Sequence, residues 1–295
     1  MLPRLGRRAV DYIAGRAAAA RAGRPFFLYL PLTSPHTPIL PSPDWKGRSG
    51  LGDYADFVMQ TDAVVGDVLR ALAEHGVAEE TLVIFTADNG CSPQAGTDAL
   101  EAKGHFASAR LRGYKADIWE GGHRVPFIAR WPGRVPAGRT SSQLICHTDL
   151  LATVVDMVGE RLPEDAGEDS VSILPALLGR DRAPLREAVV HHSINGVFAI
   201  RQAEWKLAYS PGSGGWGKPG DAEARKSGLP DLQLYDLAND LAETRNLQAE
   251  KPEVVAKLSA LLESYVARGR STPGETRKND VAVSWREATA RKKER

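Results

Sequence analysis

The chain has 295 residues, and its 38 lysines and arginines almost balance 37 acidic residues, giving a net charge of +1. This balance argues against a nucleic-acid partner or an anionic membrane surface. Apolar residues make up 42% and charged residues 25%, as in a globular chain that buries a core. No continuous apolar segment of the sequence is long enough to form a transmembrane helix. Two cysteines, Cys91 and Cys146, form neither a disulfide framework nor a zinc-binding spacing.

The first half of the chain alternates predicted helices and strands. The basic start predicts an amphipathic helix that ends near Gly23, and the apolar run 26–30 predicts a strand. Residues 53–75 carry apolar side chains at helical spacing. The branched and aromatic run 82–85 predicts a second strand, buried on both faces. Strand, helix and strand in this order predict a βαβ unit in a mostly parallel central sheet flanked by helices, an α/β fold.

The second half of the chain has a different pattern of predicted elements. The pattern changes from Val189 onward, and short alternating runs at residues 197–201, 205–209 and 232–236 predict a small antiparallel sheet. Pro252 occupies the first turn of a predicted helix, and the polar, basic end of the chain predicts disorder. We expect three parts: a main domain over residues 1–188, a small α+β subdomain over 189–270, and a disordered tail over 271–295.

Polar residues follow the predicted strands, where ligands bind in α/β sheets. His36 lies in a proline-rich loop after the first strand, and Asp88 and Asn89 follow the second. A carboxylate beside an amide offers hard oxygen ligands that suit Ca²⁺ or Mg²⁺ better than Zn²⁺, although a simple Asp-Asn-Gly turn has the same sequence. The long loop that follows carries Lys115 and His123, and loops of such length in compact domains are usually functional.

Two motifs carry a family resemblance, TADNG at residues 86–90 and GYKADIWEGGHRVPF at residues 113–127. Together with LYDL and ETRNL near the C-terminus, they resemble the sulfatase family, of the arylsulfatase type in the alkaline phosphatase superfamily. The resemblance covers nearly the whole chain. It implies an alkaline phosphatase-like fold and the hydrolysis of an aryl or carbohydrate sulfate ester. It also implies export to the periplasm or the cell exterior, and it gives no oligomeric state.

The resemblance implies roles for individual residues. Asp88 and Asn89 match two ligands of the family's divalent metal, Ca²⁺ with Mg²⁺ as the alternative. Lys115 matches the lysine that binds the sulfate ester. His36 matches the histidine that contacts the sulfate group and can protonate the leaving alcohol. His123, next to the motif's glycines, is expected either to touch substrate or to support residues that do.

His192 is expected at the rim of the pocket that binds the sulfate ester. The expected ligand of this pocket is a small sulfate ester or a sulfated carbohydrate. Two alternatives stay open. One is a phosphodiesterase or phosphonate hydrolase of the same superfamily, and the other is a non-catalytic remnant without chemistry of its own.

The family's nucleophile is missing from the sequence. It is a formylglycine made from cysteine in a motif like Cys-Ser-Pro-x-Arg upstream of His36, where this chain has no cysteine. Cys91 begins Cys-Ser-Pro, but Ala95 replaces the arginine, so we do not expect Cys91 to be the nucleophile. The paired aspartates of the metal site are also absent. We therefore expect an N-terminally truncated sulfatase that binds metal weakly, lacks turnover, and exposes apolar sheet edges that make it poorly soluble.

Overall fold

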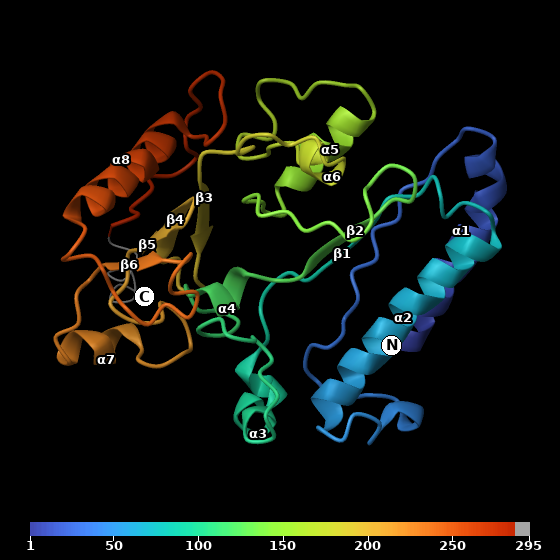
Figure 1. Cartoon of the computed structure of the whole chain (residues 1–295), viewed down its shortest axis with the longest axis horizontal. Coiled ribbons are helices and arrows are strands. Elements are labelled where there is room, and N and C mark those ends of the chain that lie inside the picture. Colours follow the sequence, from blue (N-terminus) through green and yellow to red (C-terminus); the bar gives the residue numbers. More distant parts are fainter. Residues whose placement is uncertain (287–295) are drawn as a thin grey trace. The chain divides into compact units, whose positions relative to one another are not determined.

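The computed structural model describes residues 1–286 (Figure 1). Within them the chain forms two compact units, each assembled from separate stretches of sequence. Unit 1 comprises Met1–Thr86, Ser92–Ala107 and Phe127–Ala137, and unit 2 comprises Ala87–Cys91, Ser108–Pro126 and the chain from Gly138 onward. None of the helices in residues 1–286 combines the length and the apolar character needed to span a bilayer.

Unit 1 is built on two long helices that lie side by side, α1 (Leu2–Arg21) and α2 (Asp53–Glu74) (Figure 1). Apolar residues recurring every three to four positions give each helix a buried face. Ile13 of α1 and Leu72 of α2 belong to one buried cluster. The positive φ of Gly76 ends α2, a conformation that glycine adopts without steric cost. Both predicted helices are thus confirmed. The other helical turns are η1 (Pro43–Trp45), η2 (Pro93–Ala95) and α3 (Thr97–Glu101).

The parallel βαβ unit predicted from the sequence is not confirmed. Strand β1 (Val83–Thr86) pairs antiparallel with β2 (Phe127–Arg130) in a two-stranded sheet. Residues 26–30, the expected first strand, belong to neither sheet of the described chain, and Phe27 and Tyr29 are each 76% exposed. An apolar pattern favours a strand locally, but a sheet also needs a neighbour for its backbone hydrogen bonds, and the described residues provide none here.

Unit 2 contains the small antiparallel sheet that the sequence predicts. Its strand order is β3-β4-β5-β6, and every neighbouring pair is antiparallel. The strands are β3 (Val189–His192), β4 (Phe198–Gln202), β5 (Trp205–Ala208) and β6 (Gln233–Asp236). Helix α8 (Pro252–Arg268) packs on one face (Figure 1), where Ile200, Leu207 and Leu258 are buried.

The opposite face of this sheet positions the 113–127 motif. Successive side chains of a strand point to opposite faces. Ala199, Ala208 and Tyr235, each next in sequence to a core residue of the α8 face, therefore form a second buried cluster. That cluster includes Ile118 and Trp119 from the middle of the motif. The motif is thus packed directly onto the sheet.

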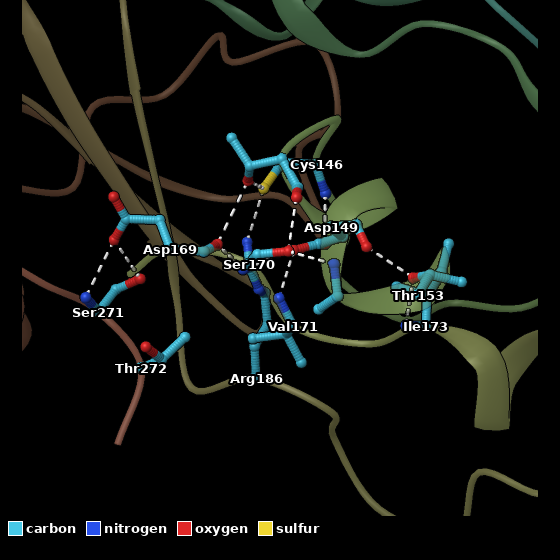
Figure 2. A network of polar contacts seen from close by, with 12 residues as sticks. Cys146, Asp149, Thr153, Asp169, Ser170, Val171, Ile173, Arg186, Ser271 and Thr272 are labelled. Atoms are coloured by element: carbon cyan, nitrogen blue, oxygen red, sulfur yellow. Dashed lines mark hydrogen bonds and ion pairs between the residues drawn. The ribbon is translucent and has the colours of Figure 1, made fainter. Parts of the chain in front are cut away.

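Helix α5 (Asp149–Met157) begins at a buried polar network (Figure 2). The carboxylate of Asp149 accepts hydrogen bonds from the backbone N–H of Cys146 (2.8 Å) and of Val171 (3.0 Å), and it pairs with Arg186 at 2.9 Å. A carboxylate at a helix start also complements the helix dipole. The short helices of unit 2 are α4 (Glu120–His123), α6 (Leu174–Leu177) and α7 (Asp221–Lys226).

Part of the expected disordered tail makes defined contacts in unit 2. The hydroxyl of Ser271 donates to the carboxylate of Asp169 at 2.7 Å, as Figure 2 shows. The ring of Trp285 is buried, edge-on to Tyr209 at 4.9 Å between centroids. Trp285 and Val283 therefore add to the core beside α8, and the rest of the expected tail, 287–295, lies outside the described residues.

Candidate functional site

The two candidate metal ligands lie just after β1 in the sequence, in the short stretch of chain that begins unit 2. Asp88 is exposed and Asn89 is half-buried. The amide nitrogen of Asn89 donates to the carbonyl of Gly90 at 2.9 Å. This bond uses the amide nitrogen and leaves the amide oxygen as the candidate ligand atom.

This stretch runs directly against the 113–127 motif. The N–H of Gly90 donates to the carbonyl of Gly122 at 3.1 Å, and the N–H of Lys115 donates to the carbonyl of Cys91 at 2.8 Å. A Cβ atom at Gly90 would lie 1.7 Å from the carbonyl oxygen of Gly121, so only glycine fits. The candidate metal ligands and the candidate sulfate-binding lysine are therefore joined through backbone hydrogen bonds.

Lys115 lies near the tip of a tight turn. The N–H of Asp117 donates to the carbonyl of Tyr114, and the Asp117 carboxylate accepts from the N–H of Tyr114, both at 3.0 Å. Ala116 has a φ of +83°, which a non-glycine residue adopts only when its surroundings require it. Burial raises the pKa of Asp117 above its usual value, although backbone N–H donors oppose the shift. The half-buried Lys115 is thus presented by a turn with little freedom.

Two loops from the C-terminal half of the sequence hold the same turn. The carbonyl of Ala116 accepts a hydrogen bond from the N–H of Ile194 at 3.0 Å. The N–H of Ile118 donates to the carbonyl of Ser213 at 2.8 Å. The turn that carries Lys115 therefore depends on the small sheet's loops as well as on its own sequence.

Behind the turn lies a buried cluster of charges. Lys206 of β5 is 0% exposed, and its ammonium lies 3.1 Å from Glu120 and 2.9 Å from Glu243. Glu243 also accepts a hydrogen bond from the N–H of Glu120 at 2.6 Å. Burial raises the pKa of Glu120, but Lys206 and Arg201 outweigh it, so this pKa lies below the usual value. Burial raises the pKa of Glu243 despite Lys206. The motif's glutamate thus joins the motif to the sheet.

His123 packs against His191, a histidine that lies outside the sequence motifs. Its ring centroid lies 4.3 Å from that of His191, and the Nε2 atoms of both rings are buried without a hydrogen-bond partner in the described chain. Burial, with a smaller effect from Lys206, lowers the pKa of His123 to about 4. Burial and His123 lower the pKa of His191. Both rings are therefore neutral at pH 7.

The structure places His192, the histidine expected at the pocket rim, on the other side of β3. Its ring contacts Phe198, with centroids 4.0 Å apart, and burial lowers its pKa. Because side chains alternate along a strand, only one of two adjacent histidines can face His123. The contact with His191 could not be read from the sequence, because the run 189–192 was not among the predicted strands and the face that meets His123 is set by a contact between distant residues.

His36 belongs to unit 1, whereas the other candidate residues belong to unit 2. Its side chain is exposed, and its Nδ1 lies 2.7 Å from the carbonyl of Thr37. The hydroxyl of Thr37 donates to Gln94 at 3.3 Å. The contacts of His36 are therefore local to its loop.

The donor set suits a hard cation in kind. Asp88 and Asn89 supply a carboxylate and an amide oxygen, which Ca²⁺ and Mg²⁺ prefer. In residues 1–286, no three His, Cys, Asp or Glu side chains lie close enough together to hold a metal ion. Two adjacent donors are a minority of the ~6–8 oxygens that Ca²⁺ takes. These residues could therefore hold a divalent cation only together with further ligands.

Comparison with known proteins gives consistent results. The Sulfatase family model matches residues 4–160. An N-acetylgalactosamine-6-O-sulfatase from Bacteroides thetaiotaomicron is 36% identical over 254 residues, covering 83% of this chain and 48% of that protein. Human arylsulfatase A is 35% identical over 259 residues, covering 83% and 49%. A solved structure described under glycosaminoglycan metabolism by B. thetaiotaomicron has a TM-score of 0.77 at 33% identity, covering 90% of this chain and 54% of that chain. The chain spans about half the length of the curated relatives it matches.

Proposed function

The chain belongs to the sulfatase family, and on this premise we propose that it takes part in the hydrolysis of sulfuric esters, with Lys115 binding the sulfate group. One observation carries the proposal. The N–H of Lys115 is hydrogen-bonded to the carbonyl of Cys91, two residues after the candidate metal ligand Asn89. The positively charged side chain of Lys115 and the oxygen atoms of the candidate metal ligands thus belong to one small region of unit 2.

The chemistry of a sulfate ester requires such a region. The ester is an anion, and negative charge grows on its oxygens and on the leaving oxygen as the S–O bond breaks. Fixed positive charge that meets the oxygens stabilises this change because it needs no reorganisation during the reaction. The ammonium of Lys115 supplies one such charge. A divalent cation, when held by Asp88 and Asn89 with further ligands, supplies Lewis-acid stabilisation.

We assign the histidines different roles. His36, exposed on its loop, is the candidate proton donor to the leaving oxygen. His123 is neutral and half-buried against His191, so it supports the motif or offers the substrate an uncharged surface. The substrate class that we propose, a sulfated carbohydrate or an aryl sulfate, follows the names of the two curated relatives.

A binding experiment tests the role of Lys115. The full chain is titrated with 4-nitrophenyl sulfate in CaCl₂ by isothermal titration calorimetry, and Lys115→Met is compared with Lys103→Met, an exposed lysine of unit 1. We expect Lys115→Met to weaken binding at least about tenfold, which corresponds to ~1.4 kcal/mol. We expect Lys103→Met to leave the affinity unchanged.

The same titration with bis(4-nitrophenyl) phosphate separates sulfate from phosphodiester recognition. Equal affinity of wild type and Lys115→Met for the sulfate would rule out the assignment of Lys115. A clear preference for the phosphodiester would favour the other hydrolases of the superfamily.

A further inference from the structure

We propose that Trp216 and Ile194 form an apolar rim beside Lys115 that receives the ring of a sulfated sugar. This inference rests on the proposed function of Lys115 as the sulfate-binding residue. It names the part of the substrate next to the sulfate and the side chains that contact it. The argument starts from the two loops that hold the Lys115 turn.

Trp216 is linked to the Lys115 turn through the side chain of Asp117. Its N–H donates to the Asp117 carboxylate at 3.0 Å, and the N–H of Gly217 donates to the same oxygen at 2.7 Å. Asp117 is two residues from Lys115, a distance of at most about 7 Å along the chain. A Cβ at Gly215 would lie 2.3 Å from the carbonyl oxygen of Ala116, so the loop needs glycine to come this near.

Ile194 approaches the same turn from another loop. Its N–H donates to the carbonyl of Ala116, the residue after Lys115, at 3.0 Å. The two loops are also joined to each other, because the hydroxyl of Ser193 donates to the carbonyl of Gly214 at 2.7 Å. The backbone of both loops therefore meets the chain within two residues of Lys115.

The side chains of Trp216 and Ile194 are nevertheless open to solvent. Trp216 is 53% exposed and Ile194 is 59% exposed, although Ser193 and Ser213 of the same loops are buried. A scattered exposed apolar residue needs no explanation, but here two large ones occur on adjoining loops next to a candidate ligand-binding lysine. A local apolar surface beside a cation suits a ligand with both an anionic group and an apolar face.

The loop that carries Trp216 is held in place by buried and half-buried polar groups. Asp221 accepts hydrogen bonds from the hydroxyl of Ser210 at 2.7 Å and from the N–H of Gly214 at 2.9 Å. The amide of Gln233 donates to the carbonyls of Ser210 at 2.6 Å and of Gly212 at 2.8 Å. The exposed indole is thus carried on a loop already ordered before binding, which lowers the entropy cost of contacting a ligand.

An exposed indole beside a lysine favours a sugar ring over a plain aryl group as the part of the substrate next to the sulfate. A tryptophan offers a flat apolar face together with an N–H donor at its edge. A pyranose matches both, because it has an apolar C–H face and hydroxyl groups around its edge. The exposed Lys218, two residues after Trp216, adds a further donor near the ring. An aryl sulfate would use only the apolar face.

Calorimetric titrations of the full chain in CaCl₂ test the inference with two probes, galactose 6-sulfate and inorganic sulfate. We expect Trp216→Ala to weaken binding of galactose 6-sulfate at least about fivefold, while the affinity for inorganic sulfate stays unchanged. Trp216→Phe should retain most of the affinity for the sugar sulfate. The matched control is Leu229→Ala, which removes another exposed apolar side chain of unit 2 and should change neither affinity.

Lys115→Met distinguishes failure of the inference from failure of the proposed function. If Lys115→Met weakens both probes but Trp216→Ala binds galactose 6-sulfate like wild type, the rim is wrong and the role of Lys115 stands. If Lys115→Met changes neither affinity, the role of Lys115 and the apolar rim are both wrong. Binding of 4-nitrophenyl sulfate without binding of galactose 6-sulfate would overturn the sugar assignment.

Discussion

The Lys115 turn of unit 2 and the 26–40 segment of unit 1 both carry candidate site residues, but the chain holds them in opposite ways. The turn is surrounded by buried groups, among them Asp117 and Lys206, each 0% exposed. The 26–40 segment instead presents Phe27 and Tyr29 to solvent, and His36 at its far end makes local contacts. The first region has its apolar and charged partners within unit 2. The second packs Phe26 and Leu28 against the helices of unit 1 but leaves Phe27 and Tyr29 exposed.

This difference indicates which parts of the candidate site are self-sufficient. The turn that carries Lys115 is held by hydrogen bonds to three separate stretches of unit 2, those of Cys91, Ile194 and Ser213. The position of His36 is set by a proline-rich loop. Substitutions should therefore disturb the two regions unequally, and the following predictions run from the largest expected effect to the smallest.

The largest effect is expected for Lys206→Met. It leaves Glu120 and Glu243 buried without the ammonium that lies between them. Removing one partner of a buried ion pair typically costs ~3–5 kcal/mol. Urea unfolding followed by circular dichroism should show this loss in unit 2. Lys226→Met, at an exposed lysine of α7, should change the free energy of unfolding by less than about 0.5 kcal/mol.

A second variant identifies the cause. Adding Glu243→Gln to Lys206→Met removes one uncompensated carboxylate and should recover part of the lost stability. If the single variant unfolds like wild type, the buried charges do not hold the motif to the sheet.

The next effect concerns the junction between the candidate metal ligands and the motif. Gly90→Ala places a Cβ 1.7 Å from the carbonyl oxygen of Gly121, so the backbone must move. Overpacking of this kind costs ~1–3 kcal/mol. The control Gly220→Ala adds a methyl group where nothing lies within 4 Å. A Gly90→Ala protein with wild-type stability and wild-type sulfate binding would contradict the close approach.

The pH dependence of stability tests the histidine pair. The pKa of His123 is about 4 in the folded chain against a usual value of 6.5, and that of His191 is also lowered. Between pH 6.5 and 4 the unfolded chain therefore binds protons that the folded chain does not, and stability falls as pH falls through this window. His123→Gln should flatten the dependence of the free energy of unfolding on pH, measured by urea unfolding at a series of pH values. His105→Gln, at an exposed histidine, should leave the slope as it is.

The smallest effect on stability is expected in the exposed region. Phe27→Ser replaces an exposed apolar side chain of unit 1, so the free energy of unfolding should change by no more than about 0.5 kcal/mol. Aggregation should decrease, because less apolar surface is open to other chains. Static light scattering at increasing concentration measures this. A large loss of stability would show that Phe27 is covered after all.

The sequence predicted the elements that depend on local pattern. Helices α1, α2 and α8 follow from apolar periodicity, and the small antiparallel sheet follows from alternation within short runs. The pairing of β1 with β2 could not be read in the same way. It is a choice of partner between strands far apart in the chain, and a parallel alternative has the same local pattern.

The candidate site shows the same limit. Lys115 and the pair after β1 were recognisable from their motifs, and the structure joins them by backbone hydrogen bonds. The contact between Glu120 and Lys206 spans 86 residues, so no spacing in the sequence reveals it. The contact of His191, rather than His192, with His123 was not predicted, because strand β3 was not recognised and the alternation that separates the two depends on it.

A crystal structure of the chain grown with CaCl₂ and 4-nitrophenyl sulfate tests the central claim most directly. The account predicts that a sulfate oxygen accepts a hydrogen bond from the Lys115 ammonium, with Ca²⁺ bound by oxygens of Asp88 and Asn89. Sulfate bound away from Lys115, with the side chains of Asp88 and Asn89 turned from the cation, would contradict it.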